Sequence, residues 1–323
     1  MPDYKTVCVT GGAGFIGSHL VRTLLRQGIA VRVLDNLSVG RRENVLSDAE
    51  FVHGDILDSS AVKEALQSCD AVFHLAARVA IRSSFEFVVQ DTQTNFSGTA
   101  SVLQEAVRTQ TVRKVVFTSS MGVYAEADSP SPISENHPTT PISPYGISKL
   151  AAERLTHNMC GAHGLESTVV RLFNTYGPGQ ALSPYVGVVT IFVNRLLAGE
   201  RPTVFGDGEQ TRDFVHVEDV VQGLLAALRN VPSGQTFNIG SGIPCSVNSV
   251  LRLLQNIMGT SLPPKYVEAA PGELRYSVAD ISRATHKLGY VLKHRLETSL
   301  PQVVEEITGK SAPELASSAV PER

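Results

Sequence analysis

The chain has 323 residues, of which 42% are hydrophobic and 18% are charged, and its formal net charge is −3. This is the composition of a globular protein with enough apolar residues for a large core, and the length suits about two domains. The small net charge and the absence of a dense Lys/Arg run make nucleic acid and anionic membranes poor candidates for the main partner.

Short apolar runs alternate with longer helix-like segments through the first half of the chain. The expected strands lie near residues 6–10, 30–35, 50–55, 71–76, 114–120 and 167–173, and the expected helices near 15–27, 59–67, 86–109 and 144–160. Runs this short and continuously apolar are typical of parallel strands that are covered on both faces. The alternation therefore predicts an α/β fold with a Rossmann-type, doubly wound parallel sheet.

The amino-acid composition changes near residue 174, after which Pro and Gly become frequent. Strand-like segments return at RDFVHV and TFNIG, each followed by a helix-like stretch. We therefore expect residues 1–173, with a returning segment at about 209–240, to form the sheet domain. Residues 174–208 and 241–310 are expected to form a smaller, mostly C-terminal α/β domain. The small and polar stretch 311–323 is expected to be a flexible tail.

Targeting and metal-binding signals are not found in the sequence. The cysteines at 8, 69, 160 and 245 form no CxxC site and no compact disulfide framework, which fits a reducing cytosol. No signal-peptide pattern and no run of about 20 apolar residues is present. His216 alternates with apolar residues, so we interpret it as a structural histidine rather than a metal ligand. We expect a cytoplasmic protein without a metal site.

The stretch VTGGAGFIGSHL follows the first expected strand and opens the first expected helix. Its glycines can be read as Gly11-x-x-Gly14-x-x-Gly17 or as Gly12-x-Gly14-x-x-Gly17. Glycine lets the backbone approach a pyrophosphate, and the helix N-terminus offers free N–H donors. Asp35 ends the second strand, 18 residues after Gly17, close to the spacing of about 20 for an acid that binds the adenosine ribose. The pattern predicts a dinucleotide site, with a tight structural turn as the alternative. The carboxylate, which would repel a 2′-phosphate, favours NAD over NADP.

Two further strand ends carry small or acidic residues. Asp55 follows the third strand, where it could contact the adenine or equally serve as a helix N-cap or turn residue. Ala76 and Ala77 follow the fourth strand, where small side chains would let a cofactor lie across the strand ends. Small residues are also common in ordinary packing.

The stretch PISPYGISKLAAERL begins a helix, with Ser143 as a suitable N-cap and Pro144 as the first helical residue. Tyr145 and Lys149 are then i and i+4, on one face of that helix. A phenol with a pKa near 10 is a poor base, but an adjacent ammonium stabilises the phenolate and lowers that pKa. Such a tyrosine can take a proton from an alcohol while hydride leaves the carbon. A surface Tyr–Lys pair is the alternative.

Together these motifs resemble the extended short-chain dehydrogenases/reductases. The Gly-rich turn, Asp35, FHLAA, Ser119-Ser120, the Tyr145/Lys149 pair and RLFNTYGPGQ look like nucleotide-sugar epimerases and dehydratases of the UDP-galactose 4-epimerase type. The resemblance runs from about residue 6 to 307 in one register. It implies NAD as cofactor, a nucleotide sugar as substrate, and a homodimer formed through the helices near 86–109 and 144–160.

The resemblance also implies which residues contact cofactor and substrate. Cofactor contacts are expected from Gly11, Gly14, Phe15, Ile16, Gly17, Asp35, Asn36, Asp55, Ile56, Leu75, Ala76, Ala77, Asn95, Tyr145 and Lys149. Substrate contacts are expected from Ser120, Tyr145, Asn174, Arg212 and Arg275.

The pyrophosphate is the expected partner of Arg212, because a guanidinium fork suits phosphate oxygens. The alternatives are a structural ion pair of Arg212 with Asp213 or Asp219, and a turn-forming role for Asn174. Ala270 stands where many relatives have Arg, which leaves the nucleobase open.

The loop after the strand at 114–120 separates the reaction types of the family. By resemblance, Ser120 is the catalytic hydroxyl that relays the proton of the substrate O4 to Tyr145. Members that dehydrate the sugar place Asp-Glu directly afterwards, whereas this chain has Met121 and Gly122, which can do no acid–base work. What remains is reversible oxidation at one carbon. We therefore expect an isomerase, an NAD-dependent 4-epimerase that interconverts UDP-glucose and UDP-galactose, or their N-acetyl forms, through a transient 4-keto sugar.

Other functions stay open at this point. Within enzymes, the alternative is an epimerase or 4-keto reductase acting on a dTDP-6-deoxyhexose or on UDP-glucuronate. From another class, the chain could be a catalytically silent NAD-sensing binding protein, although such proteins typically lose the Tyr–Lys pair.

Overall fold

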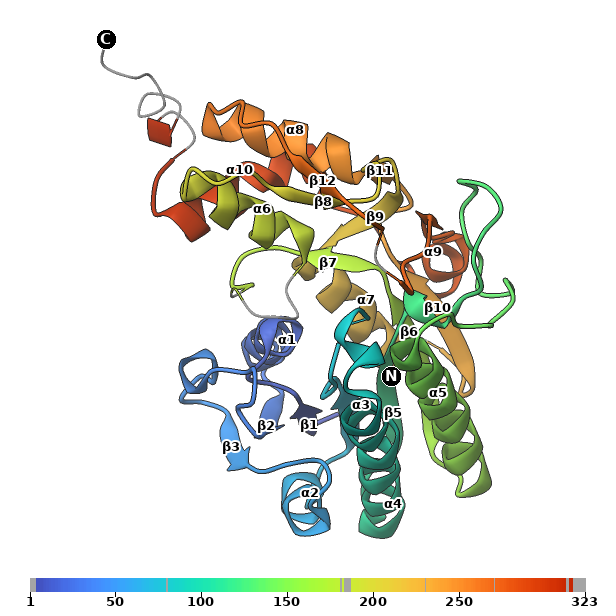
Figure 1. Ribbon diagram of the computed structural model, residues 1–323. Helices are drawn as coiled ribbons and strands as arrows, with labels where there is room; N and C mark the ends of the chain where they lie inside the picture. The colour runs from blue at the N-terminus through green and yellow to red at the C-terminus, as the bar shows by residue number, and fades with distance from the viewer. Residues whose placement is uncertain are drawn as a thin grey trace.

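The structure is a computed structural model that describes residues 4–79, 81–180, 182, 187–229, 231–269, 271–311 and 314–315. Figure 1 shows two lobes, a larger one built on a central sheet and a smaller one that contains α6, α8 and α10. No helix of these described ranges combines the length and the apolar character needed to cross a membrane.

The central sheet has seven parallel strands in the order β10-β6-β5-β4-β1-β2-β3. The order reverses between β1 and β4, which places a ligand crevice outside the carboxyl ends of these strands. The predicted doubly wound sheet is therefore confirmed. The strand bounds are β1 Thr6–Thr10, β2 Ala30–Asp35, β3 Glu50–His53, β4 Ala71–His74, β5 Lys114–Ser120, β6 Glu166–Leu172 and β10 Gln235–Ile239.

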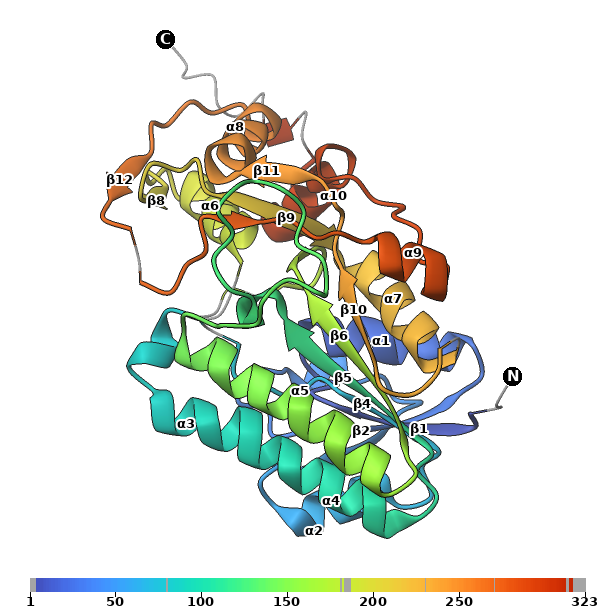
Figure 2. The ribbon, with the colours of Figure 1, turned by 90° about the vertical axis from the view of Figure 1, so that its right-hand side faces the viewer.

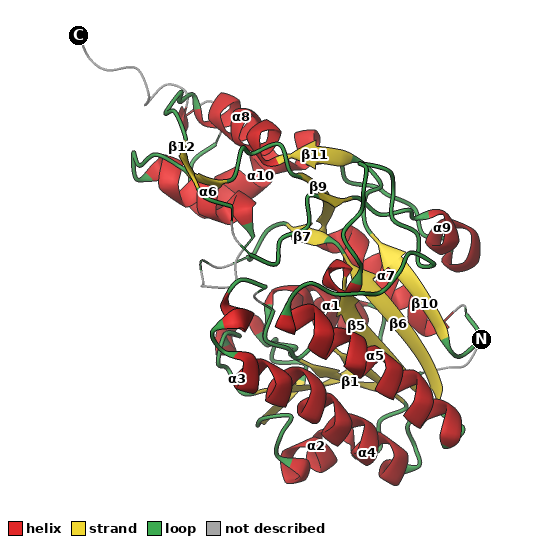
Figure 3. Ribbon diagram, turned by 45° about the vertical axis from the view of Figure 1, so that its right-hand side comes forward, coloured by secondary structure: helices red, strands yellow, loops and turns green. Residues whose placement is uncertain are grey.

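Helices cover both faces of this sheet, which explains why its strands are apolar on both sides. Helices α1 (Phe15–Arg26) and α7 (Val217–Arg229) pack on one face. On the other lie α2 (Ser59–Leu66), α4 (Thr99–Thr109) and α5 (Pro144–Ala162), in front of the yellow strands in Figure 3. The helix expected near 86–109 is α3 (Val88–Thr92) joined to α4 by a π-helical turn, Gln93–Gly98.

The smaller lobe combines short strands with three helices. A four-stranded sheet contains β7 (Asn174–Tyr176), β9 (Thr211–His216), β11 (Pro244–Ser246) and β13 (Tyr276–Ser277), and β8 (Thr203–Phe205) pairs with β12 (Lys265–Val267). Their apolar side chains form a core with α6 (Val188–Leu197), α8 (Val247–Met258) and α10 (Leu296–Thr308). Figure 2 shows this lobe above the large sheet, with α9 (Ser282–Leu288) near β10.

One expectation about the second half needs correction. Strand β9 lies inside the segment 209–240 that was expected to return to the large sheet, but it pairs with β7, β11 and β13. The sequence of a strand that is buried on both faces does not indicate which of two sheets it joins. The rest of the segment does return to the large sheet, because α7 packs on it and β10 pairs within it. Most of the expected tail 311–323 lies outside the described residues; of its described residues, Leu315 is buried against the core of the smaller lobe. The exact domain boundaries stay a prediction.

Candidate active site

The predicted site residues gather at the carboxyl edge of the large sheet. The Gly-rich turn follows β1, Asp35 ends β2, Asp55 follows β3, Ala76 and Ala77 follow β4, and Ser120 ends β5. Because all these strands are parallel, their carboxyl ends meet at one edge. Phe15, Ile16, Leu75, Ala76 and Ala77 are all half-buried there.

The Gly-rich turn has the shape that a pyrophosphate requires. Gly11 has a φ of 71°, and a Cβ at this position would lie 2.8 Å from the backbone nitrogen of Ala76. A Cβ on Gly17 would lie 2.1 Å from the carbonyl oxygen of Gly11. Gly14 caps α1 without a side-chain hydrogen bond, and the first turn of α1 has no acidic residue. The first N–H groups of α1 therefore suit an anion, and this turn fits the pyrophosphate of NAD.

Acidic side chains beside this turn fit the ribose end of NAD. Asp35 is 8% exposed and accepts hydrogen bonds from the backbone nitrogens of Ala13 (3.0 Å) and Leu37 (2.8 Å). Burial raises the pKa of Asp35, while these two donors lower it. The Asn36 amide donates to Asp55 at 2.7 Å, so these two predicted residues form one polar cluster. Two fixed carboxylates are suitable acceptors for ribose hydroxyl groups.

Two other predicted cofactor residues are buried inside the protein. Ile56 is 5% exposed and packs against Gly98, where a Cβ would lie 2.5 Å from the Ile56 side chain. The amide of Asn95 accepts from the backbone nitrogen of Arg78 at 2.9 Å and donates to the Ser148 hydroxyl at 3.3 Å. Asn95 thus links the loop after β4 to α5. Direct contact of either side chain with the cofactor stays a prediction.

The three predicted catalytic residues lie together. Ser120 accepts a hydrogen bond from the backbone nitrogen of Gly122 at 3.2 Å, and a Cβ on Gly122 would lie 3.5 Å from the Ser120 hydroxyl and 3.6 Å from the Tyr145 ring. The first turn of helix α5 packs closely against this loop, and only glycine fits at position 146. A Cβ there would lie 2.1 Å from the Gly122 carbonyl oxygen. Lys149 is buried one turn after Tyr145, with its Nζ 4.4 Å from the centroid of the Phe117 ring.

The predicted lowering of the Tyr145 pKa is wrong for this structure. Burial raises the pKa of Tyr145 to about 12, although a hydrogen bond with Ser120 lowers it. Burial also lowers the pKa of Lys149 to about 7, against the charge of Glu153, which raises it. The physical reason is that burial disfavours the phenolate and the ammonium alike. The spacing of the two residues does not reveal how deeply they are buried.

Replacing Lys149 by methionine is expected to raise the free energy of unfolding by roughly 2–5 kcal/mol at pH 6. The pKa of Lys149 is about 7 in the folded chain against an ordinary value of 10.5. Below pH 7 the folded chain therefore keeps an unfavourable buried ammonium. Between pH 7 and 10.5 the unfolded chain binds one more proton than the folded chain, so the stability of the natural chain rises with pH and the advantage of the variant shrinks.

Urea unfolding at pH 6, 8 and 10 measures this pH dependence. Lys63→Met, at an exposed position of α2, is the matched control and should show no comparable trend. A stability difference for Lys149→Met that is constant across the three pH values would contradict the prediction.

Three of the predicted substrate residues, Asn174, Arg212 and Arg275, belong to the smaller lobe. Asn174 begins β7, and its side-chain oxygen is buried without a hydrogen-bond partner among the described residues. Arg212 on β9 is 8% exposed and donates to the carbonyl oxygen of Leu274 at 2.7 Å. It forms no ion pair with Asp213 or Asp219 in the described part of the chain; its ionic neighbour is Glu273, at 3.5 Å. Arg275 is more exposed and pairs with Asp207 at 2.6 Å.

The structure adds residues that the sequence reasoning missed. Arg82, after β4, lies 2.5 Å from Glu273 and places its guanidinium carbon 3.8 Å from the centroid of the Phe205 ring. These residues come from three distant segments, so no local pattern connects them. The one available signal was the acid in PGELRYS, two residues before Arg275.

One histidine cluster needs a separate account. His216, Glu218 and His294 offer potential ligand atoms within 4.8 Å of one another. However, the rings of His216 and His294 are stacked, with centroids 4.4 Å apart and planes inclined by 30°. A metal lies in the plane of each imidazole that binds it, which this stacking opposes. His294 instead contacts Asp219 at 3.1 Å and Glu218 at 3.3 Å. A structural role for His216 stays our interpretation.

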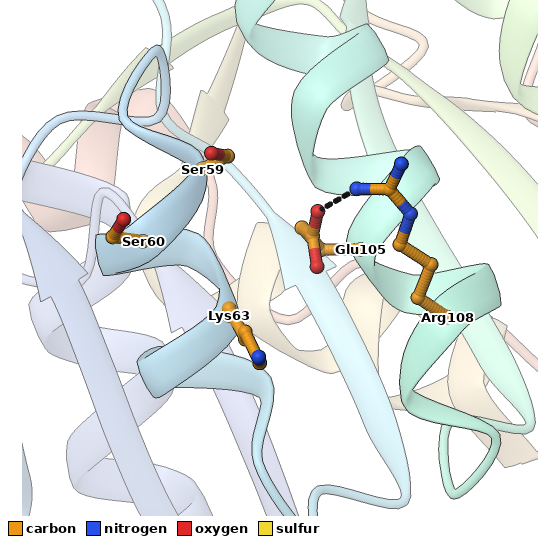
Figure 4. Close-up of a pocket in the computed structure, with 5 residues that line it drawn as sticks. All are labelled: Ser59, Ser60, Lys63, Glu105 and Arg108. Atoms are coloured by element: carbon orange, nitrogen blue, oxygen red, sulfur yellow. Dashed lines mark hydrogen bonds and ion pairs between the residues drawn. The ribbon is translucent and has the colours of Figure 1, made fainter.

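A hollow of about 360 Å³ lies away from these residues, between α2 and α4. Ser59, Ser60, Lys63, Glu105 and Arg108 line it, and Glu105 pairs with Arg108 (Figure 4). It contains none of the predicted site residues. The predicted catalytic residues lie instead at the carboxyl edge of the large sheet.

Comparisons with known proteins agree with this fold and identify the family. The model of the NAD dependent epimerase/dehydratase family matches residues 7–240. A UDP-glucose 4-epimerase of Mycolicibacterium smegmatis is 37% identical over 94% of this chain and 98% of its own length. The structure of a UDP-glucose 4-epimerase from Thermotoga maritima with UDP-glucose has a TM-score of 0.90 and 38% identity, covering 94% of this chain and 99% of that one. A UDP-glucuronic acid 4-epimerase from Bacillus cereus, in complex with UDP-glucuronic acid and NAD, has a TM-score of 0.87 and 30% identity, with coverage of 94% and 99%.

Proposed function

The chain belongs to the NAD-dependent epimerase/dehydratase family, and from that premise we propose that it is a UDP-hexose 4-epimerase that uses NAD. Its substrates are UDP-glucose and UDP-galactose or their N-acetyl forms. The similar enzymes from Mycolicibacterium smegmatis and Thermotoga maritima support this substrate class. The geometry of the catalytic residues supports the reaction type.

One observation carries the proposal: the 3-10 turn Met121–Val123, which directly follows Ser120, contains no acid. The residues of this 3-10 turn are Met121, Gly122 and Val123, all buried. Among described residues, the acid whose charge raises the Tyr145 pKa is Asp91, which is 2% exposed and ion-paired with Arg78 at 2.7 Å. Expelling water from a sugar needs a free acid as well as a base. The arrangement of Ser120 and Tyr145 supports a proton transfer at one hydroxyl of the sugar.

Tyr145 acts as the acid and base of the proposed reaction. Through the Ser120 hydroxyl, it accepts the proton of the sugar O4 and later returns it. When bound, NAD supplies the hydride acceptor and donor and a positive charge near the phenol. Lys149, held one turn along α5, orients the cofactor end of the site and adds a cation when it is protonated.

The smaller lobe would hold the nucleotide while the 4-keto sugar rotates, so that either face of its C4 carbon can receive the hydride. Arg212 is buried and fixed by backbone carbonyl groups, so it provides a rigid contact for the diphosphate. Positioning of this kind supplies much of the rate gain of an enzyme that transfers no group to its own side chains.

Incubation of the purified protein with UDP-galactose, without added coenzyme, is the test. Formation of UDP-glucose is expected, and mass spectrometry of the denatured protein should release NAD. Either a requirement for added NAD(P)H or a 4-keto-6-deoxy product would contradict the proposal. Activity confined to a dTDP-6-deoxyhexose or to UDP-glucuronate would instead support the alternative function, an epimerase or 4-keto reductase for that substrate. NAD binding without any turnover would indicate a sensing protein.

Assembly and location stay predictions. A homodimer through α3, α4 and α5 is supported by apolar side chains exposed at the adjoining ends of α3 and α5, among them Val88, Val89 and Ile147. The division into an NAD-binding domain and a nucleotide-sugar-binding domain and the cytoplasmic location are proposals of the same kind.

A further inference from the structure

Arg82 joins the two sides of the ligand crevice. It follows β4 and directly precedes the short 3-10 turn Ser83–Phe85, at the carboxyl edge of the large sheet. Its Nε donates to Glu273 at 2.5 Å, and its guanidinium carbon lies 3.8 Å from the centroid of the Phe205 ring. Glu273 and Phe205 both come from the second half of the chain, on the side of the smaller lobe. A cation from the cofactor side is thus held by an acid and an aromatic ring from the substrate side.

Glu273 is shared between two guanidinium groups. One carboxylate oxygen accepts from Arg82 and the other lies 3.5 Å from Arg212. Arg212 is also fixed by the carbonyl oxygens of Thr211 (2.9 Å) and Leu274 (2.7 Å). One negative charge therefore holds two positive charges close together, and the group of three residues keeps a net charge of +1. The neighbouring Arg275 does not add to this charge, because it is paired with Asp207.

Arg82 keeps donors available for a further partner. Its side chain is 47% exposed, and among the described residues its two terminal NH₂ groups have no hydrogen-bond acceptor. Stacking on Phe205 and the bond to Glu273 restrict the side chain before any ligand arrives. A preorganised guanidinium loses less entropy on binding and matches the planar oxygen pairs of phosphate or carboxylate.

We infer that Arg82 is a substrate-binding residue that binds the diphosphate of the nucleotide sugar together with Arg212. This inference rests on the proposed function, and it assigns the diphosphate contact to both sides of the crevice. Two guanidinium groups offer one donor fork to each phosphate of a diphosphate diester, and the net charge of +1 that they keep beside Glu273 attracts an anion. A C6 carboxylate of a uronate is the other anion that such a site would take. The diphosphate is favoured because Arg82 and Arg212 share Glu273 and so lie at the same end of the ligand.

Arg82→Gln is the variant that tests the inference, since it keeps a similar side-chain length and removes the charge. Titration calorimetry of the NAD-containing protein should show UDP binding weakened by about 10- to 100-fold, the range for a lost charge-assisted contact. KM for UDP-galactose should rise by a similar factor while kcat changes by less than about threefold. Arg82→Lys should recover part of the affinity, because it restores the charge but not the fork.

Arg108→Gln is the matched control. Arg108 is likewise about half-exposed and paired with an acid, but it lies near the end of α4 that leads into the start of β5, opposite the carboxyl edge of the sheet. It should bind UDP as the natural chain does. Unchanged UDP affinity in Arg82→Gln, with normal binding and turnover by the natural chain, would overturn this inference and leave the proposed function intact. A loss confined to UDP-glucuronate, with UDP binding unchanged, would also overturn it. A natural chain that neither binds UDP nor converts UDP-galactose would instead refute the proposed function, and this inference with it.

Discussion

Replacing Tyr145 by phenylalanine is expected to lower kcat for UDP-galactose by about 10²- to 10⁴-fold while KM stays nearly constant. The variant keeps the buried ring against the Gly122 loop and removes only the hydroxyl that exchanges the O4 proton. Since the 3-10 turn Met121–Val123 has no carboxylate, none of its side chains can take over the proton transfer. The conversion of UDP-galactose to UDP-glucose, followed by chromatography, measures the effect.

Tyr266→Phe provides the control for this substitution. Tyr266 is 53% exposed on β12, and its hydroxyl donates to Asn248 far from the catalytic residues. It should retain full activity. Tyr145→Phe should unfold at a temperature close to that of the natural chain and release as much NAD, which separates lost chemistry from lost structure. Retention of more than a tenth of the natural kcat would show that Tyr145 is not the proton acceptor.

The edge of the large sheet could be predicted from the sequence because its features are local. The glycine turn and the Tyr145/Lys149 pair each depend on a spacing within one turn or helix, and Asp35 depends on its spacing of 18 residues from Gly17 within one β-α-β unit. Once the parallel sheet is accepted, its topology brings these residues to one side. The same reasoning cannot place β9, since the choice between two sheets depends on contacts with β7, β11 and β13.

Interactions between distant segments explain what the sequence could not reveal. The contact of Arg82 with Glu273 spans 191 residues, and that of Tyr124 with Asn238 spans 114. The shifts in the pKa values of Tyr145 and Lys149 also depend on segments that are distant in the sequence. A helical spacing of four predicts that Tyr145 and Lys149 share a face, but the burial that shifts both pKa values comes from the whole fold.

Gly17→Ala is expected to cause the second large effect, loss of the bound NAD together with a stability decrease of about 1–3 kcal/mol. The new Cβ would lie 2.1 Å from the carbonyl oxygen of Gly11 and 2.7 Å from the Cα of Gly12. These are backbone atoms of the tight turn, so α1 must move away from it. That movement displaces the helix N-terminus from the place where a pyrophosphate would meet its N–H groups.

Gly161→Ala makes the same chemical change in another helix and separates the steric effect from the loss of a glycine. Nothing lies within 4 Å of a Cβ at Gly161, near the end of α5. Alanine there should stabilise the helix by up to about 1 kcal/mol and leave the NAD content unchanged. The amount of NAD released on denaturation, together with urea unfolding, distinguishes the two variants. If Gly17→Ala retained NAD like Gly161→Ala, close packing of α1 on the turn would not be what makes the dinucleotide site.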